Sequence, residues 1–149
     1  MPARTAVDIV ERVADVLGGR AVFHVRVRTW GDLDRVVRAG LPKRSLQLVA
    51  RRLVEPGASV NAFVYDVVPS ATFKRRSKLS LDESQRTERL ARVIALTEAL
   101  WDDERESKAF LNRPHPLLDG DTPVHAARTE LGARRVERLV QDIEHGLSL

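Results

Sequence analysis

Three observations on the sequence predict an all-α protein. Apolar residues recur at helical spacing along most of the chain, capping residues, glycine and proline mark the ends of these segments, and a single segment alternates as a strand would. The 149 residues are 43% hydrophobic but only 5% aromatic, so the core must consist mainly of aliphatic side chains. Such a mixture suits layers of helices around a shared core.

The N-terminal region predicts one helix followed by a short strand. A helix capped by Thr5, with Asp8 three residues on, is expected to end at the Gly18-Gly19 pair. From residue 21 to residue 28, apolar and polar side chains alternate, which indicates a short half-buried strand. Because a lone strand needs a partner, this segment would pair with a second copy of the chain or pack as an extended arm. The inward positions of the first helix are Ile9, Val10, Val13, Val16 and Leu17.

Four short helices are expected in the next segment of the chain. The first is stopped by the Gly40-Leu41-Pro42 turn, and Ser45 starts the second. Ser59 is placed to cap the third, although Val, Phe and Tyr within it favour strands locally. A turn at Pro69 then precedes the fourth. The four helices are expected over residues 30–39, 45–53, 60–66 and 71–77.

A long helix opens at a capping box formed by Ser80 and Glu83, in which each side chain binds the other residue's backbone N–H. A proline- and glycine-rich loop over residues 112–123 follows it, and Pro123 is the expected first residue of a short helix. The last helix is expected from Glu130 to His145, with Leu131, Val136, Leu139, Val140 and Ile143 on its inward side. The inward stripe of the long helix is Leu90, Val93, Ile94, Thr97, Leu100 and Trp101.

Composition limits the classes of function. With 25 Lys and Arg against 21 Asp and Glu, the net charge is +4 and the pI about 10.1, which favours polyanionic partners if the excess gathers on one face. The lack of cysteine excludes disulfides, thiolate metal sites and a cysteine nucleophile. No run approaches about 18 uncharged apolar residues, so we expect a soluble, cytoplasmic protein with no membrane partner.

Residues for catalysis are sparse. The four histidines are scattered, and no zinc-protease, phosphate-loop or serine-elbow motif accompanies them. The Asp119-Gly120-Asp121 run spaces two carboxylates as a metal loop does, but it lacks further ligands, and a plain turn is the favoured interpretation. The acidic run over residues 102–106 is interpreted as a solvated surface. The sequence therefore predicts no catalytic residue, no cofactor and no metal.

The densest functional signal is a basic cluster with four cations in five positions, at residues 74–78. It lies on an expected short helix after a turn and a candidate first helix, which is the layout of a helix-turn-helix. An exposed basic helix end is an equally good interpretation from these residues alone. Phe73 would either face the DNA or pack inward. The predicted DNA-binding residues are Ser70, Thr72, Lys74, Arg75, Arg76 and Lys78.

Four segments together carry a family resemblance. They are RAGLPKRSL (38–46), TFKRRSKLSLDES (72–84), RLARVIALTEALW (89–101) and KAFLNRPHPLLDGDTPVHAARTELGARRVERLVQDIEHG (108–146). Residues 30–149 resemble the antitoxins of the Xre/MbcA/ParS family, which pair with toxins of the RES-domain family. The most specific part is the ordered set Leu111, Pro114, Leu118, Gly120, Pro123, Thr129, Gly132, Val136 and Gly146.

The resemblance implies an Xre-like helix-turn-helix lobe at 30–79, which binds operator DNA and represses its own operon, and a long helix with a C-terminal toxin-binding lobe at 80–149. Residues 1–29 form an N-terminal extension that would stabilise a homodimer. The implied partners are a RES-domain toxin that consumes NAD or transfers ADP-ribose from it, operator DNA, and further copies in a higher-order toxin–antitoxin complex. The chain itself is expected not to be an enzyme.

The resemblance also assigns local roles. Thr129 would cap the last helix, Gly132 would let another backbone approach closely, and Leu111, Pro114 and Pro123 would shape the lobe. The residues expected to contact the toxin lie on the polar face and at the end of the last helix: Arg134, Arg135, Arg138, Gln141, Glu144, His145, Gly146, Leu147, Ser148 and Leu149.

The sequence departs from the family pattern at two places. Phe110 stands where a Trp is usual, which keeps an aromatic anchor. The turn before Lys74 reads Ser-Ala-Thr-Phe in place of the commoner Arg-Thr-Leu type. This second departure makes DNA reading less secure than toxin binding.

Two other classes of function stay open at this point. A stand-alone helix-turn-helix transcriptional regulator would use the same basic helix without a toxin. A small helical enzyme would need a pocket that brings His115 or His125 close to Asp119 or Asp121.

Overall fold

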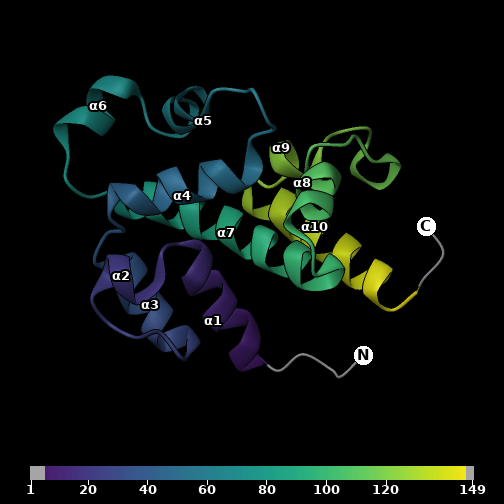
Figure 1. Cartoon of the computed structure of the whole chain (residues 1–149), viewed down its shortest axis with the longest axis horizontal. Helices are drawn as coiled ribbons and strands as arrows, with labels where there is room; N and C mark the ends of the chain where they lie inside the picture. Colours follow the sequence, from purple (N-terminus) through teal and green to yellow (C-terminus); the bar gives the residue numbers. More distant parts are fainter. Residues whose placement is uncertain (1–5, 147–149) are drawn as a thin grey trace.

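The computed structural model describes residues 6–146, which form an all-α fold (Figure 1). Within this part of the chain, no helix has both the length and the apolarity that a membrane span requires. The elements are α1 (Ala6–Val16), α2 (Gly19–Phe23), α3 (Trp30–Arg38), α4 (Lys43–Leu53), α5 (Val60–Val67), α6 (Ser70–Arg75), α7 (Leu81–Trp101), α8 (Glu104–Leu111), the 3-10 helix η1 (Pro116–Leu118), α9 (Pro123–Ala126) and α10 (Glu130–Glu144).

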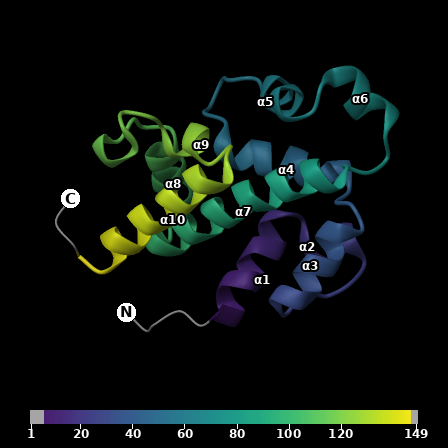
Figure 2. The ribbon, with the colours of Figure 1, turned by 180° about the vertical axis from the view of Figure 1, so that it is seen from behind.

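The 21-residue helix α7 is the axis of the molecule. Figures 1 and 2 show it running between α1–α3 on one side and α4 on the other, with α5 and α6 near its N-terminal end and α8–α10 near its C-terminal end. Consecutive residues Val93, Ile94 and Ala95 are all buried. A helix that is buried at consecutive positions has neighbours on several faces, so α7 belongs to the core of both ends of the molecule.

The N-terminal helix is confirmed and packs against α7, with the buried residues Val10, Val13 and Val16. The Thr5 cap lies outside the described residues. The predicted strand at 21–28 is wrong, because residues 19–23 form α2 and the following segment has no regular structure. No neighbouring strand exists within residues 6–146 to pair with it, whereas a helical turn satisfies its backbone internally, as the His24 N–H donation to Arg20 O at 2.9 Å shows.

The four helices expected after residue 29 are present with adjusted ends. Thr29 caps α3 through a capping box with Asp32, which the sequence reading missed. Ser59 caps α5 as predicted. Helix α4 begins before Ser45, whose buried hydroxyl instead donates to Leu17 O at 2.7 Å and ties α4 to the end of α1. Helix α6 ends at Arg75, two residues earlier than expected.

The predicted capping box of α7 is confirmed: the Ser80 hydroxyl accepts from Glu83 N, and the Glu83 carboxylate accepts from Ser80 N at 2.7 Å. Helix α8 was not predicted, because the acidic run that follows α7 was interpreted only as a solvated surface. In the structure Asp102 ends α7 with a positive φ of 50°, and Asp103 Oδ1 caps α8 by accepting from Arg105 N. The run is therefore a helix junction.

The corner between α9 and α10 is built on Gly132. Thr129 caps α10 by accepting from Gly132 N at 3.0 Å, as predicted. A Cβ at Gly132 would lie 1.7 Å from the carbonyl oxygen of Ala126, so the two backbones approach as closely as expected. Leu131 was predicted to face inward, but its side chain is 74% exposed. It precedes Val136 by five positions, and this spacing sets the two side chains about 140° apart on a helix.

We expect Gly132→Ala to destabilise the protein by at least about 2 kcal/mol, because the methyl group would meet a backbone carbonyl that cannot move alone. The matched control is Gly31→Ala in α3, where the nearest atom to an added Cβ is the Thr29 hydroxyl at 3.6 Å. Alanine there should change stability by about 1 kcal/mol or less, in the stabilising direction. Chemical denaturation of both variants checks this, and equal unfolding midpoints would contradict the packing described for this corner.

Candidate functional site

Two surfaces are candidates for function. The first surrounds α5 and α6, two short helices joined at Val68-Pro69, of which α5 lies over α4 (Figure 1). The second is the exposed side of α10 together with the loop before α9. Each holds residues that the sequence singled out, and each is fixed to α7 by its own polar contacts.

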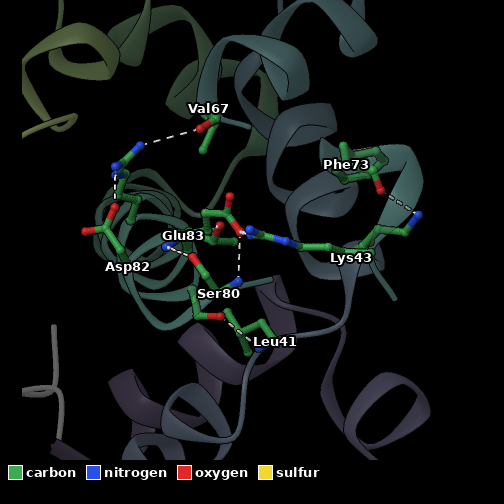
Figure 3. Close-up of polar contacts among 11 residues, drawn as sticks. Leu41, Lys43, Val67, Phe73, Ser80, Asp82 and Glu83 are labelled. Atoms are coloured by element: carbon green, nitrogen blue, oxygen red, sulfur yellow. Dashed lines mark hydrogen bonds and ion pairs between the residues drawn. The ribbon is translucent and has the colours of Figure 1, made fainter. Parts of the chain in front are cut away.

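Phe73 anchors α6 to the rest of the first surface. Its side chain is buried and meets the Tyr65 ring edge-on, with 6.0 Å between the ring centroids. Lys43 Nζ donates to the carbonyl oxygen of Phe73 at 2.8 Å and lies 4.8 Å from the centre of its ring (Figure 3). Of the two roles considered for Phe73, the structure shows inward packing.

Only part of the basic cluster lies on α6. Lys74 and Arg75 are exposed in its last turn, whereas Arg76 and Lys78 follow the helix in an extended segment. The prediction of four cations on one short helix is therefore wrong. The helix stops because Arg76 is extended, and the backbone of Lys78 forms an antiparallel bridge with Pro42.

The cations also differ in how they are held. Arg76 Nη1 lies 2.9 Å from Glu83 Oε1, the carboxylate oxygen that also accepts from Ser80 N. Lys74 Nζ is 5.9 Å from the centre of the Tyr65 ring. Within residues 6–146, the Arg75 side chain has no hydrogen-bond or ion-pair partner. The exposed Lys78 side chain has no such partner within these residues either, so Arg75 and Lys78 are the cations most available to an outside anion, whereas Arg76 ties the end of α6 to the cap of α7.

Further polar contacts fix this surface to α7, and Figure 3 shows them around the first turns of that helix. The buried Ser84 hydroxyl accepts from Leu41 N at 2.9 Å. Arg86 donates to Val67 O at 3.5 Å and pairs with Asp82. The sequence reading missed these roles, although the Asp82 to Arg86 spacing of four is a recognisable helical ion pair. Ser70 and Thr72 are half-buried at the start of α6.

On the second surface, α10 presents the predicted polar residues to solvent. Arg134 pairs with Glu130 at 3.3 Å, and Arg138 pairs with Asp142 at 3.2 Å. His145 Nδ1 lies 2.8 Å from Gln141 O at the end of the helix. The exposed members of the predicted set are Arg134, Arg135, Arg138, Gln141, Glu144, His145 and Gly146, whereas Leu147, Ser148 and Leu149 lie outside the described residues.

Arg135 links α10 to the preceding loop. Its Nη2 donates to Leu117 O at 3.1 Å and lies 2.9 Å from Asp119 Oδ2. Beside this contact, Leu117 is 51% exposed and Leu131 is 74% exposed. The sequence reading missed both as surface residues. They border an open groove of about 560 Å³, lined by Leu117, Leu131, Arg134, Arg135, Arg138, Leu139 and Asp142.

Ion pairs hold α10 against α7. Arg92 Nε lies 3.4 Å from Glu88 Oε1 in its own helix and 3.2 Å from Glu137 Oε1 in α10. Burial raises the pKa of both carboxyls, and the positive charge of Arg92 opposes that rise. Arg89 adds a second bridge, 3.1 Å from Glu130 Oε2. The position of α10 is therefore set by charge as well as by its apolar side.

Of the two histidines that an enzyme could use, only His125 lies beside one of the two aspartates, Asp121. His125 Nδ1 lies 2.7 Å from Asp121 Oδ2, and the hydrogen bond from His125 is the main cause of a lowered pKa at Asp121. His115 instead accepts from Leu117 N through its Nδ1. Asp119 forms a turn, with a φ of 56°. The His125 side chain is exposed and that of Asp121 is partly exposed, by the start of α9.

Comparison with known proteins shows that the region of the second surface is similar to a known family of domains. Residues 96–146 match the family model described as the antitoxin Xre/MbcA/ParS C-terminal toxin-binding domain. The resemblance to the Xre/MbcA/ParS antitoxins is confirmed. This Xre/MbcA/ParS match begins inside α7 at Leu96 and takes in α8, η1, α9 and α10, so it includes the whole of the groove beside Leu131.

A curated relative extends the Xre/MbcA/ParS resemblance beyond this region. The chain is 29% identical over 102 residues to the antitoxin Xre of Pseudomonas putida (strain KT2440). The alignment covers 66% of this chain and 64% of that protein, so the chain spans slightly less than two thirds of its relative's length.

Proposed function

We propose that this chain is the antitoxin of a type II toxin–antitoxin system and neutralises a RES-domain toxin by binding it directly. The observation that carries the proposal is the match of residues 96–146 to a toxin-binding domain. The exposed side of α10 supports it, because the arginines there are held in place by their own ion pairs and the helix is fixed to α7 by Arg92 and Arg89. A surface that is rigid before binding loses less entropy on binding.

In this proposal the reaction belongs to the toxin, which consumes NAD or transfers ADP-ribose, and the chain described here is a non-enzymatic inhibitor that acts in the cytoplasm. Binding would cover the entrance to the toxin's active site. The complex would contain several copies of each chain.

We further propose that the first surface binds operator DNA and represses the chain's own operon. The availability of Lys74 and Arg75 at the end of α6 supports this, as does the net charge of +4. Two copies in a dimer would match the two halves of a palindromic operator. The surface would orient the protein on DNA through phosphate contacts, with Ser70 and Thr72 at the start of α6 nearest the bases.

Co-expression of the chain with the product of its neighbouring gene tests the antitoxin role. We expect the neighbour alone to stop growth and deplete cellular NAD, and the pair to grow normally and co-purify as a stable complex. A double substitution of Lys74 and Arg75 by alanine is the matched control, since it should leave neutralisation intact. A neighbour that is harmless and does not bind would contradict the antitoxin role and leave a stand-alone helix-turn-helix regulator.

Arginines 75 and 76 should behave differently on DNA although they are adjacent. Log affinity for DNA falls linearly with log salt concentration, and each phosphate contact adds about 1 to the steepness of this fall. We expect Arg75→Ala to reduce the steepness by about 1, because it removes one such contact. Arg76→Ala should leave that slope unchanged and cost about 1 kcal/mol of stability or less, because it breaks a partly exposed ion pair with Glu83.

Binding to a promoter fragment of the chain's own operon at four or more salt concentrations, with denaturation of both variants, checks this expectation. An equal loss of slope in both variants would show that Arg76 leaves Glu83 to contact phosphate. A normal slope for Arg75→Ala would place the DNA-binding surface elsewhere.

A further inference from the structure

We infer that the groove beside Leu117 and Leu131 receives an apolar side chain of the toxin, and that this contact anchors the complex more than the arginines around it. The inference rests on the proposed function, because it identifies what the toxin presents to the same surface. It changes the expected basis of recognition from charge to apolar burial.

Leu117 and Leu131 are large apolar side chains that are exposed to solvent. Leu117 comes from η1 and Leu131 from the first turn of α10, so they are distant in sequence and are brought together by the fold. Both are more than half exposed at the edge of one groove whose lining also includes Leu139. An apolar hollow with a polar rim is a typical place for a partner's anchor side chain.

The arginines around the groove are already paired with carboxylates of the same chain. Each arginine on the rim already has an acidic partner: Arg134 with Glu130, Arg135 with Asp119, and Arg138 with Asp142. The positive and negative charges of these pairs cancel locally. These arginines are already neutralised by their carboxylates, so an acidic toxin side chain would meet little net positive charge here, whereas an apolar side chain can enter the groove and leave all three pairs intact.

The two sides of the groove are joined by contacts within the chain, so the groove exists before the toxin binds. Arg135 joins α10 to the carbonyl oxygen of Leu117 as well as to Asp119, and so holds the two walls at a fixed separation. The Arg92 contact to Glu137 fixes α10 on its other side. A preformed hollow binds a side chain without first ordering its own walls.

The toxin is the occupant favoured over a second copy of the chain because of where the groove lies. All of its lining residues fall between positions 117 and 142, inside the region that matches the toxin-binding domain. A dimer on DNA would form at the first surface, whose helix α6 lies well away from α10 in both views (Figures 1 and 2).

The test measures the affinity of the full-length chain for the purified RES-domain toxin by calorimetry, in low and high salt. We expect Leu131→Ser to weaken binding about tenfold or more, as loss of a central interface anchor does, and Leu117→Ser with Leu131→Ser to weaken it further. Leu131→Met should restore most of the affinity. The matched control is Val25→Ser, an apolar side chain 52% exposed but outside the matched region, which should bind like the wild type.

Salt dependence separates apolar from charged recognition. We expect the wild-type affinity to change less than threefold between low and high salt, and Arg134→Gln to bind nearly as well as the wild type. Normal affinity in both leucine variants, or a steep loss of affinity with salt together with a large effect of Arg134→Gln, would overturn the inference while leaving the antitoxin role standing.

Failure of the proposed function, or self-association through the groove, would give two further and different results. If the wild-type chain does not bind the toxin at all, the proposed function fails and the inference fails with it. If Leu131→Ser converts a dimer of the free chain to a monomer by light scattering, the groove joins two copies and the inference is overturned. Because Leu131 is exposed, its replacement is not expected to unfold the chain, and circular dichroism of each variant verifies this.

Discussion

The burial of α7 is the constraint on which the rest of the structure depends. Its side chains at Ala91, Ile94 and Ala95 are almost completely inaccessible to solvent, and small residues at several of these positions let neighbouring helices approach closely. The two buried threonines keep this helix free of unsatisfied hydroxyls, because Thr87 donates to Glu83 O and Thr97 donates to Val93 O. Helices α1, α3, α4, α8 and α10 all pack directly against α7, whereas α5 packs mainly on α4.

The first turns of α7 and its middle carry different polar contacts, and this difference underlies the two separate functions proposed. At the N-terminal end, hydroxyl groups and one shared carboxylate hold the first surface in place through Ser84 and Glu83. In the middle of α7, partly exposed ion pairs from Arg89 and Arg92 hold α10. The surfaces are attached to different parts of the same helix, and Arg128, just before α10, also joins them directly by pairing with Asp66 of α5.

Much of the fold could be predicted because local rules decide it. The capping boxes and the 3.6-residue spacing depend only on nearby residues, so the start of α7 and the start of α10 follow from Ser80, Thr129 and their neighbours. The predictions at residues 21–28 and at the acidic run after α7 were wrong or incomplete for the opposite reason. A strand needs a distant partner, and the capping role of Asp103 depends on α7 having already ended at a left-handed residue.

The candidate sites show the same limit. Exposure of Arg134 and Arg138 followed from helix periodicity, whereas the pairing of Arg76 with Glu83 and of Arg135 with Asp119 joins residues whose proximity only the fold creates. Leu131 was misplaced because its chemical type was given more weight than its spacing from Val136. The groove beside it could not be predicted at all, since its walls come from two elements joined by a turn.

Hydrogen exchange measured by mass spectrometry tests most directly whether DNA and toxin use separate surfaces, one around α6 and the other on α10 and the loop before α9. The full-length chain would be compared alone, with operator DNA and with the toxin. The account predicts that DNA slows exchange within residues 70–78 and that toxin slows exchange within residues 117–146, with each region unaffected by the other partner. Protection of the same region by both partners, or toxin protection confined to α5 and α6, would contradict it.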